Sequence, residues 1–229
     1  MRTSEPLVIG GLIFSDIDQA DFTGPFEVLS RVPDSRFLVI GRTAEPIKDV
    51  RGLILTPEIT MAETPALDVL LIPGGTGVNA LMEDAETLAF VRKQAAGAKL
   101  ILSVCTGALI CGAAGLLKGR RATTHWASHH LLAPFGATPV DERVVIDEPF
   151  IFAAGVTSGI DGALQAAAQL RGIEAAQGIQ LYLEYAPNPP FTSGSPHTAP
   201  AAVLAATQEL LRPVIDARAV LVHRITSHA

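Results

Sequence analysis

The chain has few of the residues that mark disulfide-rich or metal-binding proteins. It contains two cysteines and one tryptophan among 229 residues. Small secreted domains that lack a large core need far more cysteine than this. Cys105 and Cys111 lie six positions apart, which suits neither a local disulfide nor a zinc site. These features predict free thiols in a reducing compartment, and no metal site.

Charge and long apolar runs are also scarce. Only 17% of the residues are charged, the formal net charge is −6, and no basic cluster occurs. Nucleic acid is therefore not expected as a partner. No run approaches the roughly 18–20 apolar residues that span a bilayer. The first residues lead directly into a strand-like run without a signal-peptide pattern. We expect a cytoplasmic protein without a membrane partner.

Apolar residues make up 48% of the chain, which indicates a large buried core. Strand-like apolar runs alternate with helical patterns along the sequence. The predicted strands are 7–14, 37–41, 53–55 (at an edge), 68–73, 100–104, and the hairpin 143–146 with 150–153. The predicted helices run from Thr23 (as N-cap) to 31, 84–96, 108–117, from Ser158 with a Ser158–Asp161 capping box, and 173–185. This alternation predicts a three-layer, doubly wound α/β sandwich with a mostly parallel, flavodoxin-like sheet.

A proline-rich stretch interrupts this pattern near the end. Residues 186–200 hold five prolines and cannot form a regular element. We therefore predict an α/β domain over 1–186. Residues 187–229 are predicted to form a proline-rich segment and a C-terminal helical arm packed on the same domain. Pro213 is expected to kink or split the helix of that arm.

Cys105 stands between a buried strand and a helix. Four of the five residues from Leu100 to Val104 are apolar, and small residues follow from Ala108. A side chain at such a sharp turn projects over the end of the sheet, as in a nucleophile elbow. The helix would also direct its N–H groups at the sulfur and favour the thiolate. The alternative is a small buried cysteine without chemistry.

Ligands of doubly wound sheets bind outside the carboxyl ends of the strands. That rule gathers Asp21, Gly74, Gly75 and Cys105 at one edge. A carboxyl group beside a thiol can act as general acid or base, although Asp21 can equally serve as a helix cap. Glu27 is either an exposed helix carboxylate or a second acid in the same cleft.

The backbone around Cys105 offers a further candidate site. The N–H groups of Gly74 and Gly75, with that of Thr106, can form an oxyanion-type hole, or the glycines can simply make a tight turn. His125 ends a strand-like segment and is within reach of the site. Threonine, and not histidine, directly follows the cysteine.

Six motifs resemble those of the ThiJ/PfpI superfamily, which has the class I glutamine-amidotransferase-like fold. They cover nearly the whole chain in order. The motifs are Asp21-Phe-Thr-Gly-Pro-Phe-Glu27, Leu71-Ile-Pro-Gly-Gly75, Ser103-Val-Cys-Thr-Gly-Ala108, Ala122-Thr-Thr-His-Trp126, Ala154-Gly-Val-Thr-Ser-Gly-Ile-Asp161 and Tyr185-Ala-Pro-Asn-Pro-Pro-Phe191.

The combination of Asp-x-Thr-Gly-Pro with Cys-Thr-Gly resembles the superfamily members that hydrate isonitriles. That resemblance implies conversion of R–N≡C to an N-substituted formamide by a homodimer without metal or organic cofactor. It makes Cys105 the nucleophile, Asp21 the acid/base and Thr106 an assisting group. Because an isonitrile carries no full charge, an apolar pocket lined by residues such as Ile17, Phe22 and Phe191 is expected.

Other members of the superfamily suggest two alternatives. One is a non-catalytic dimer that senses a ligand or oxidant through a Cys105 sulfenic acid stabilised by Asp21. The other is a glyoxalase-like or deglycase-like enzyme. Peptidase and glutaminase activities are disfavoured because histidine does not follow Cys105. The regulators of the superfamily append a DNA-binding region, for which no sequence signal is present here.

Overall fold

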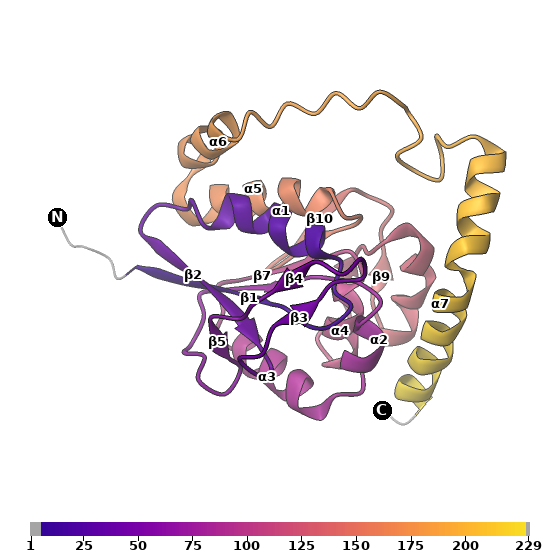
Figure 1. The fold of residues 1–229 in the computed structure, drawn as a ribbon, viewed down its shortest axis with the longest axis horizontal. Helices are drawn as coiled ribbons and strands as arrows, with labels where there is room; N and C mark the ends of the chain where they lie inside the picture. The colour runs from indigo at the N-terminus through magenta and orange to yellow at the C-terminus, as the bar shows by residue number, and fades with distance from the viewer. Residues whose placement is uncertain (1–5, 228–229) are drawn as a thin grey trace.

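A seven-stranded sheet runs through the middle of the protein, between two layers of helices (Figure 1). The computed structural model describes residues 6–227, so residues 1–5 and 228–229 of the two predicted regions lie outside it. The strand order is β10-β11-β7-β6-β1-β2-β5. The strands are β1 (Leu7–Leu12), β2 (Ser35–Gly41), β5 (Ile59–Thr60), β6 (Val69–Ile72), β7 (Leu100–Val104), β10 (Val144–Asp147) and β11 (Phe150–Ala153).

Neighbouring strands are parallel except for β10, which pairs antiparallel with β11. Helices α1 (Gln19–Leu29) and α5 (Ser158–Arg171) pack together on one face, and α6 (Ile173–Tyr182) packs on α5. The other face carries α2 (Val78–Leu81), α3 (Ala85–Ala95) and α4 (Gly107–Ala113). The predicted three-layer, mostly parallel α/β sandwich is confirmed.

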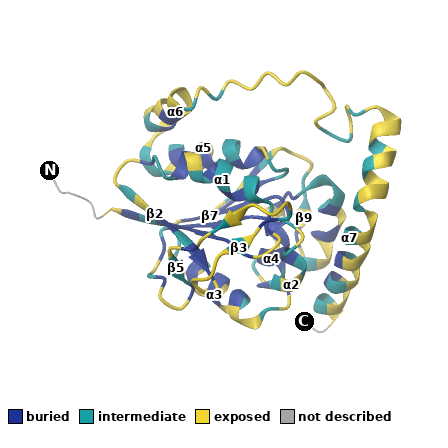
Figure 2. Cartoon of the chain, viewed as in Figure 1, coloured by how far each residue is buried: buried dark blue, intermediate teal, exposed yellow. Residues whose placement is uncertain are grey.

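The core follows the central strands (Figure 2). Every residue of β6 and β7 is buried. This is expected for parallel strands covered by helices on both faces, and it explains why these segments are continuous apolar runs. The end of β7 is therefore a rigid platform for the residue that follows it.

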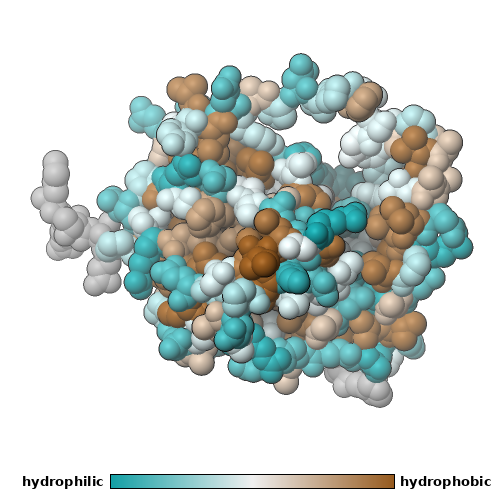
Figure 3. All heavy atoms as spheres, viewed as in Figure 1, coloured by the Kyte–Doolittle hydropathy of each residue, from teal (hydrophilic) through white to brown (hydrophobic). Residues whose placement is uncertain are grey.

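Small elements complete the domain. They are β3 (Ile47–Lys48) with β4 (Ile54–Leu55), β8 (Arg121–Ala122) with β9 (Thr138–Pro139), and the 3₁₀ helices η1 (Trp126–Leu131) and η2 (Ala133–Phe135). Residues 53–55 were expected at an edge of the main sheet. Instead, β4 pairs with β3 in a separate hairpin, and β5 is the edge strand. Hydrophobic side chains gather over this hairpin (Figure 3), where Leu53 and Ile54 are exposed.

One predicted helix start and one predicted helix cap are wrong, although α5 does begin at Ser158 as predicted. Helix α1 begins at Gln19, because Asp18 caps it by accepting a hydrogen bond from the N–H of Ala20 at 3.2 Å. Thr23 therefore lies inside the helix. The Ser158–Asp161 capping box does not form, since the Asp161 carboxylate accepts hydrogen bonds from side chains of other segments instead.

Helix α7 (Ala201–Ser227) follows an irregular arch over residues 184–200 and packs against η1 and η2. It continues through Pro213. The proline removes one backbone hydrogen bond but does not divide the helix, contrary to the expected split. No helix within residues 6–227 is long and apolar enough to cross a membrane.

Candidate active site

Cys105 occupies a strained turn between β7 and α4. Its φ is +55°, in the left-handed region that residues other than glycine rarely adopt. Such a conformation costs on the order of 1–3 kcal/mol. The Thr124 hydroxyl donates to the carbonyl of Cys105 at 2.7 Å, and the Cys105 N–H donates to Ala153 at 2.9 Å. A Cβ at Gly107 would lie 2.1 Å from the carbonyl oxygen of Ile72, so only glycine fits behind the turn. The predicted nucleophile elbow is present.

Asp21 lies fully buried beside the thiol. Its Oδ2 accepts a hydrogen bond from the Gly74 N–H at 3.0 Å, and its Oδ1 has no fixed partner among the described residues. Burial raises the pKa of Asp21 from 3.8 to about 7, and the neighbouring charge of Asp18 adds to this rise. Hydrogen bonds from Cys105 and Gly74 offset part of it. Asp21 can therefore hold or release a proton near neutral pH.

The Cys105 thiol is also harder to ionise than a free cysteine. Burial raises its pKa well above 9.0, and the negative charge of Asp21 adds to the effect. The N–H of Thr106 lowers the pKa, but less than burial raises it. The N–H of Thr106 at the helix terminus thus favours the thiolate, as predicted, but burial outweighs it and the net shift of the pKa is upward. Because the two side chains interact, Cys105 and Asp21 titrate as a coupled pair, with both protonated below about pH 7.

The two glycines after β6 hold the pair in place. The Gly75 N–H donates to the Thr106 hydroxyl at 3.1 Å, and that hydroxyl donates to the Gly75 carbonyl at 3.3 Å. Because the N–H groups of Gly74 and Gly75 are already engaged with Asp21 and Thr106, the structure does not support their predicted role in an oxyanion hole. A Cβ at Gly74 would lie 2.6 Å from the Thr106 hydroxyl oxygen, so a side chain there would disrupt the site.

A cavity of about 380 Å³ opens over Cys105. It lies at the carboxyl ends of the strands, as the fold rule predicts. Loops after β1, β6 and β7, residues before η1 and α5, and one face of α7 surround it. The lining residues are Asp16, Asp18, Val50, Arg51, Gly75, Thr76, Cys105, Thr106, His125, Val156, Leu211, Val214 and Arg218.

Three predicted pocket residues lie elsewhere. The side chain of Ile17 is fully buried, and Phe22 packs against Phe26 and Phe37 in the core. Phe191 is 77% exposed on the arch before α7. None of the three lines the cavity, whose apolar wall consists of valines and a leucine instead.

Of the two further candidates, only His125 reaches the site. Glu27 forms an ion pair with Arg31 at 2.7 Å on the exposed side of α1. His125 lines the cavity and accepts a hydrogen bond from the Ala127 N–H at 3.4 Å. Burial and the nearby charge of Arg218 lower its pKa, which keeps its ring neutral near pH 7.

Comparison with known proteins places this geometry in a family. Residues 9–169 match the DJ-1/PfpI family. The chain belongs to that family. It is 49% identical over 218 residues to the isonitrile hydratase of Pseudomonas putida, covering 95% of this chain and 96% of that protein.

Solved structures agree with this assignment. A THiJ/PfpI family protein from Pseudomonas syringae superposes with a TM-score of 0.92 and 41% identity, over 95% of this chain and 90% of that one. Drosophila melanogaster DJ-1beta has a TM-score of 0.70 at 23% identity, over 78% of this chain and 98% of that one, and shares the fold. The predicted ThiJ/PfpI resemblance is confirmed.

Arg218 is a further residue of this DJ-1/PfpI site that the sequence patterns do not indicate. It is buried on α7 and lines the cavity with Cys105. Leu211, Ile215 and Val222 recur at helical spacing, and Arg218 falls on the same stripe. The signal available in the sequence is a charged residue at a position of this helical stripe that is otherwise apolar.

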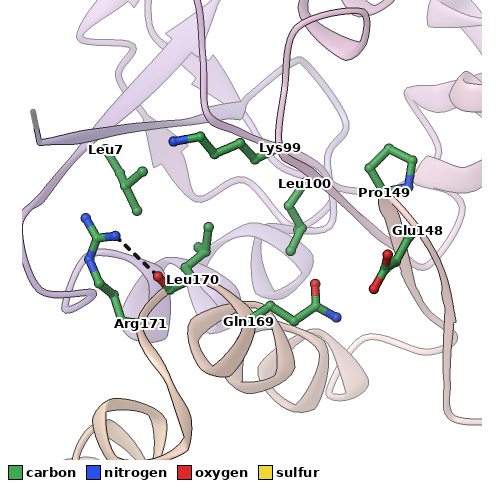
Figure 4. Close-up of a pocket in the computed structure, with 8 residues that line it drawn as sticks. All are labelled: Leu7, Lys99, Leu100, Glu148, Pro149, Gln169, Leu170 and Arg171. Carbon is green, nitrogen blue, oxygen red and sulfur yellow. Dashed lines mark hydrogen bonds between the residues drawn. The ribbon is translucent and has the colours of Figure 1, made fainter. Parts of the chain in front are cut away.

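A second cavity, of about 460 Å³, lies at the amino ends of the strands (Figure 4). It contains no cysteine, and its cations are already engaged. Lys99 pairs with Asp68 at 2.8 Å, and Arg171 donates to the carbonyls of Pro33 and Leu170. Among residues 6–227, no cluster of histidine, cysteine and carboxylate side chains is arranged to hold a metal ion. The DJ-1/PfpI site over Cys105 is therefore the better candidate for chemistry.

Proposed function

We propose that this chain is an isonitrile hydratase, which adds water to R–N≡C and releases an N-substituted formamide. The observation that carries the proposal is the buried Cys105–Asp21 pair at the elbow. Similarity to the Pseudomonas putida isonitrile hydratase along 95% of the chain supports it.

The first step uses the one proton that the pair shares. The sulfur of Cys105 forms a bond to the terminal carbon of the isonitrile, and the shared proton moves to that same carbon from Asp21. The product is a thioimidate, R–N=CH–S–Cys105, and Asp21 is left as a carboxylate. One group thus supplies the acid that makes the carbon electrophilic while its neighbour supplies the nucleophile.

The second step reuses the carboxylate. Asp21 accepts a proton from water as the water oxygen bonds to the thioimidate carbon, and then passes that proton to the nitrogen, which leaves Asp21 ionised again. Collapse of this adduct breaks the carbon–sulfur bond and releases R–NH–CHO, and the hydroxyl proton of the adduct returns to the pair. Thr106 assists by fixing the Gly75 backbone beside the thiol.

The environment of the pair suits this chemistry. An isonitrile is small and carries no full charge, and the cavity wall offers Val156, Leu211 and Val214 beside the polar groups. A buried carboxyl with a pKa of about 7 exchanges its proton readily at neutral pH, as a group that acts first as acid and then as base must.

The sensor alternative has less support. Cysteines that respond to peroxide are accessible and ionise readily. Cys105 is 6% exposed, and burial raises its pKa. The glyoxalase-like alternative predicts lactate formation from methylglyoxal, which separates it from the hydratase in one assay.

The decisive experiment is turnover of simple alkyl and aryl isonitriles, with formamide quantified by chromatography. Wild type is expected to turn over, whereas Cys105→Ala and Asp21→Asn lose at least about 1,000-fold in rate, since each removes a partner of the shared proton. Glu27→Gln, an exposed carboxylate of the same helix, serves as the control and retains wild-type turnover. Wild-type rates in Cys105→Ala would rule out covalent catalysis.

Two further properties belong to the proposal. The chain is proposed to act as a homodimer, as the family resemblance implies, and in the cytoplasm, as its few cysteines predict. Gel filtration with light scattering tests the dimer, and a mass equal to one chain would contradict it.

A further inference from the structure

One cation in the wall of the cavity over Cys105 has no carboxylate partner. Arg218 is only 4% exposed, and no ion pair involves it within the described part of the chain. Its guanidinium donates to neutral oxygens: Asn79 Oδ1 at 2.8 Å, Ser128 Oγ at 2.9 Å and the Gly75 carbonyl at 3.2 Å. Burial of a charge among neutral partners is unfavourable, so a residue that needed only to pack would not require the charge.

The contacts of Arg218 lead directly to the nucleophile. The Gly75 carbonyl that accepts from Arg218 also accepts from the Thr106 hydroxyl at 3.3 Å. Thr106 is bonded through the backbone to Cys105, and both line the cavity together with Arg218. The C-terminal helix therefore reaches the elbow through a single shared carbonyl.

We propose that Arg218 is a positioning residue for Cys105. It holds the Gly75 backbone against Thr106, and its positive charge stabilises the thiolate that attacks the substrate. Helix α7 is then part of the active site, although it lies far beyond the elbow in the sequence. This role rests on the proposed function only in taking Cys105 as the nucleophile.

The other charges around the cavity explain why such a cation is needed. They are Asp16, Asp18, Arg51 and His125 in the wall, with Asp21 beside the thiol. Asp21 and Asp18 oppose ionisation of Cys105, whereas Asp16 is exposed to solvent. Arg51 is exposed and screened by solvent, and the lowered pKa of His125 keeps that ring neutral. Arg218 is thus the buried positive charge that offsets the carboxylates.

The test is alkylation of Cys105 by iodoacetamide, followed by peptide mass spectrometry from pH 7 to pH 12, because burial raises the pKa of the thiol well above 9.0. Arg218→Gln is expected to move the midpoint of the alkylation profile upward by about one pH unit, because thiolate is the reactive form. Arg218→Lys keeps the charge and is expected to restore most of the shift. Arg212→Gln, an exposed arginine of the same helix, is the matched control and leaves the midpoint unchanged.

The midpoint of the pH profile is diagnostic, because a looser cavity would change the alkylation rate of Cys105 by the same factor at every pH. An unchanged midpoint in a folded Arg218→Gln protein would overturn the proposal. If that variant fails to fold, Ser128→Ala can be used instead, because it removes one hydrogen-bond acceptor of the guanidinium. It is expected to give a smaller upward shift of the midpoint, and an unchanged midpoint would again overturn the proposal. No isonitrile is used, so a protein that shows the shift but makes no formamide refutes the proposed function and leaves the role of Arg218 standing.

Discussion

Replacing Asp21 by Asn should make the stability of the protein less sensitive to pH. Burial raises the pKa of Asp21 from 3.8 to about 7 in the folded state. The folded protein therefore retains a proton that the unfolded chain releases. Between about pH 4 and pH 7 the free energy of unfolding of wild type falls by about 1.4 kcal/mol for each pH unit, which totals roughly 4 kcal/mol across the whole interval. This contribution is fully present below the unfolded pKa of 3.8 and is lost as the pH rises through about 7.

The asparagine variant has no such titration. Its side-chain oxygen can still accept the Gly74 N–H, so the local hydrogen bond is kept. From pH 5 to pH 7, urea denaturation of the two proteins should therefore show the variant gaining about 2.5 kcal/mol relative to wild type. The Cys105 thiol does not interfere, because its raised pKa keeps it neutral over this range.

Glu27→Gln is the control for this measurement, since Glu27 is an exposed carboxylate on the same helix. Its difference from wild type should stay nearly constant over the same pH range. A constant difference between wild type and Asp21→Asn from pH 5 to pH 7 would refute the raised pKa of Asp21, and with it the shared proton on which the mechanism depends.

Three other predictions concern the elbow and its surroundings. The rate of formamide formation should rise with pH through about 7, because the Cys105–Asp21 pair then loses one of its two protons and becomes reactive. A rate that falls through pH 7 would count against that assignment. Gly74→Ala should lower turnover by at least about 100-fold in a folded protein, because its Cβ would lie 2.6 Å from the Thr106 hydroxyl oxygen; unchanged turnover would contradict this packing. Gly107→Ala should lower the thermal midpoint by about 5 °C or more, since its Cβ would lie 2.1 Å from the Ile72 carbonyl; a wild-type midpoint would show that the elbow can relax.

The parts of the fold that local patterns determine could be predicted from the sequence. The apolar run of Leu100–Val104 and the small residues after it defined the elbow, because a strand buried on both faces is continuous in apolar residues. The rule that ligands bind at the carboxyl ends of parallel strands then brought Asp21 next to Cys105, although the two are far apart in the sequence.

Features that depend on packing between distant segments could not be predicted. The sequence does not reveal which side of α7 faces the cavity, so Arg218 was missed and Phe191 was placed in a pocket that it does not reach. The net shift of the Cys105 pKa could not be predicted for a related reason. The helix terminus can be read from local sequence, whereas burial of the thiol depends on everything packed around it.

The central claim is that Cys105 and Asp21 act together as nucleophile and acid on an isonitrile. The most direct measurement is the mass of the Cys105 peptide after acid quenching of the enzyme during turnover. The account predicts an increase equal to the mass of one isonitrile in wild type, and no increase in Cys105→Ala. Formamide production at an undiminished rate without any adduct on Cys105, and with full activity in Cys105→Ala, would contradict it.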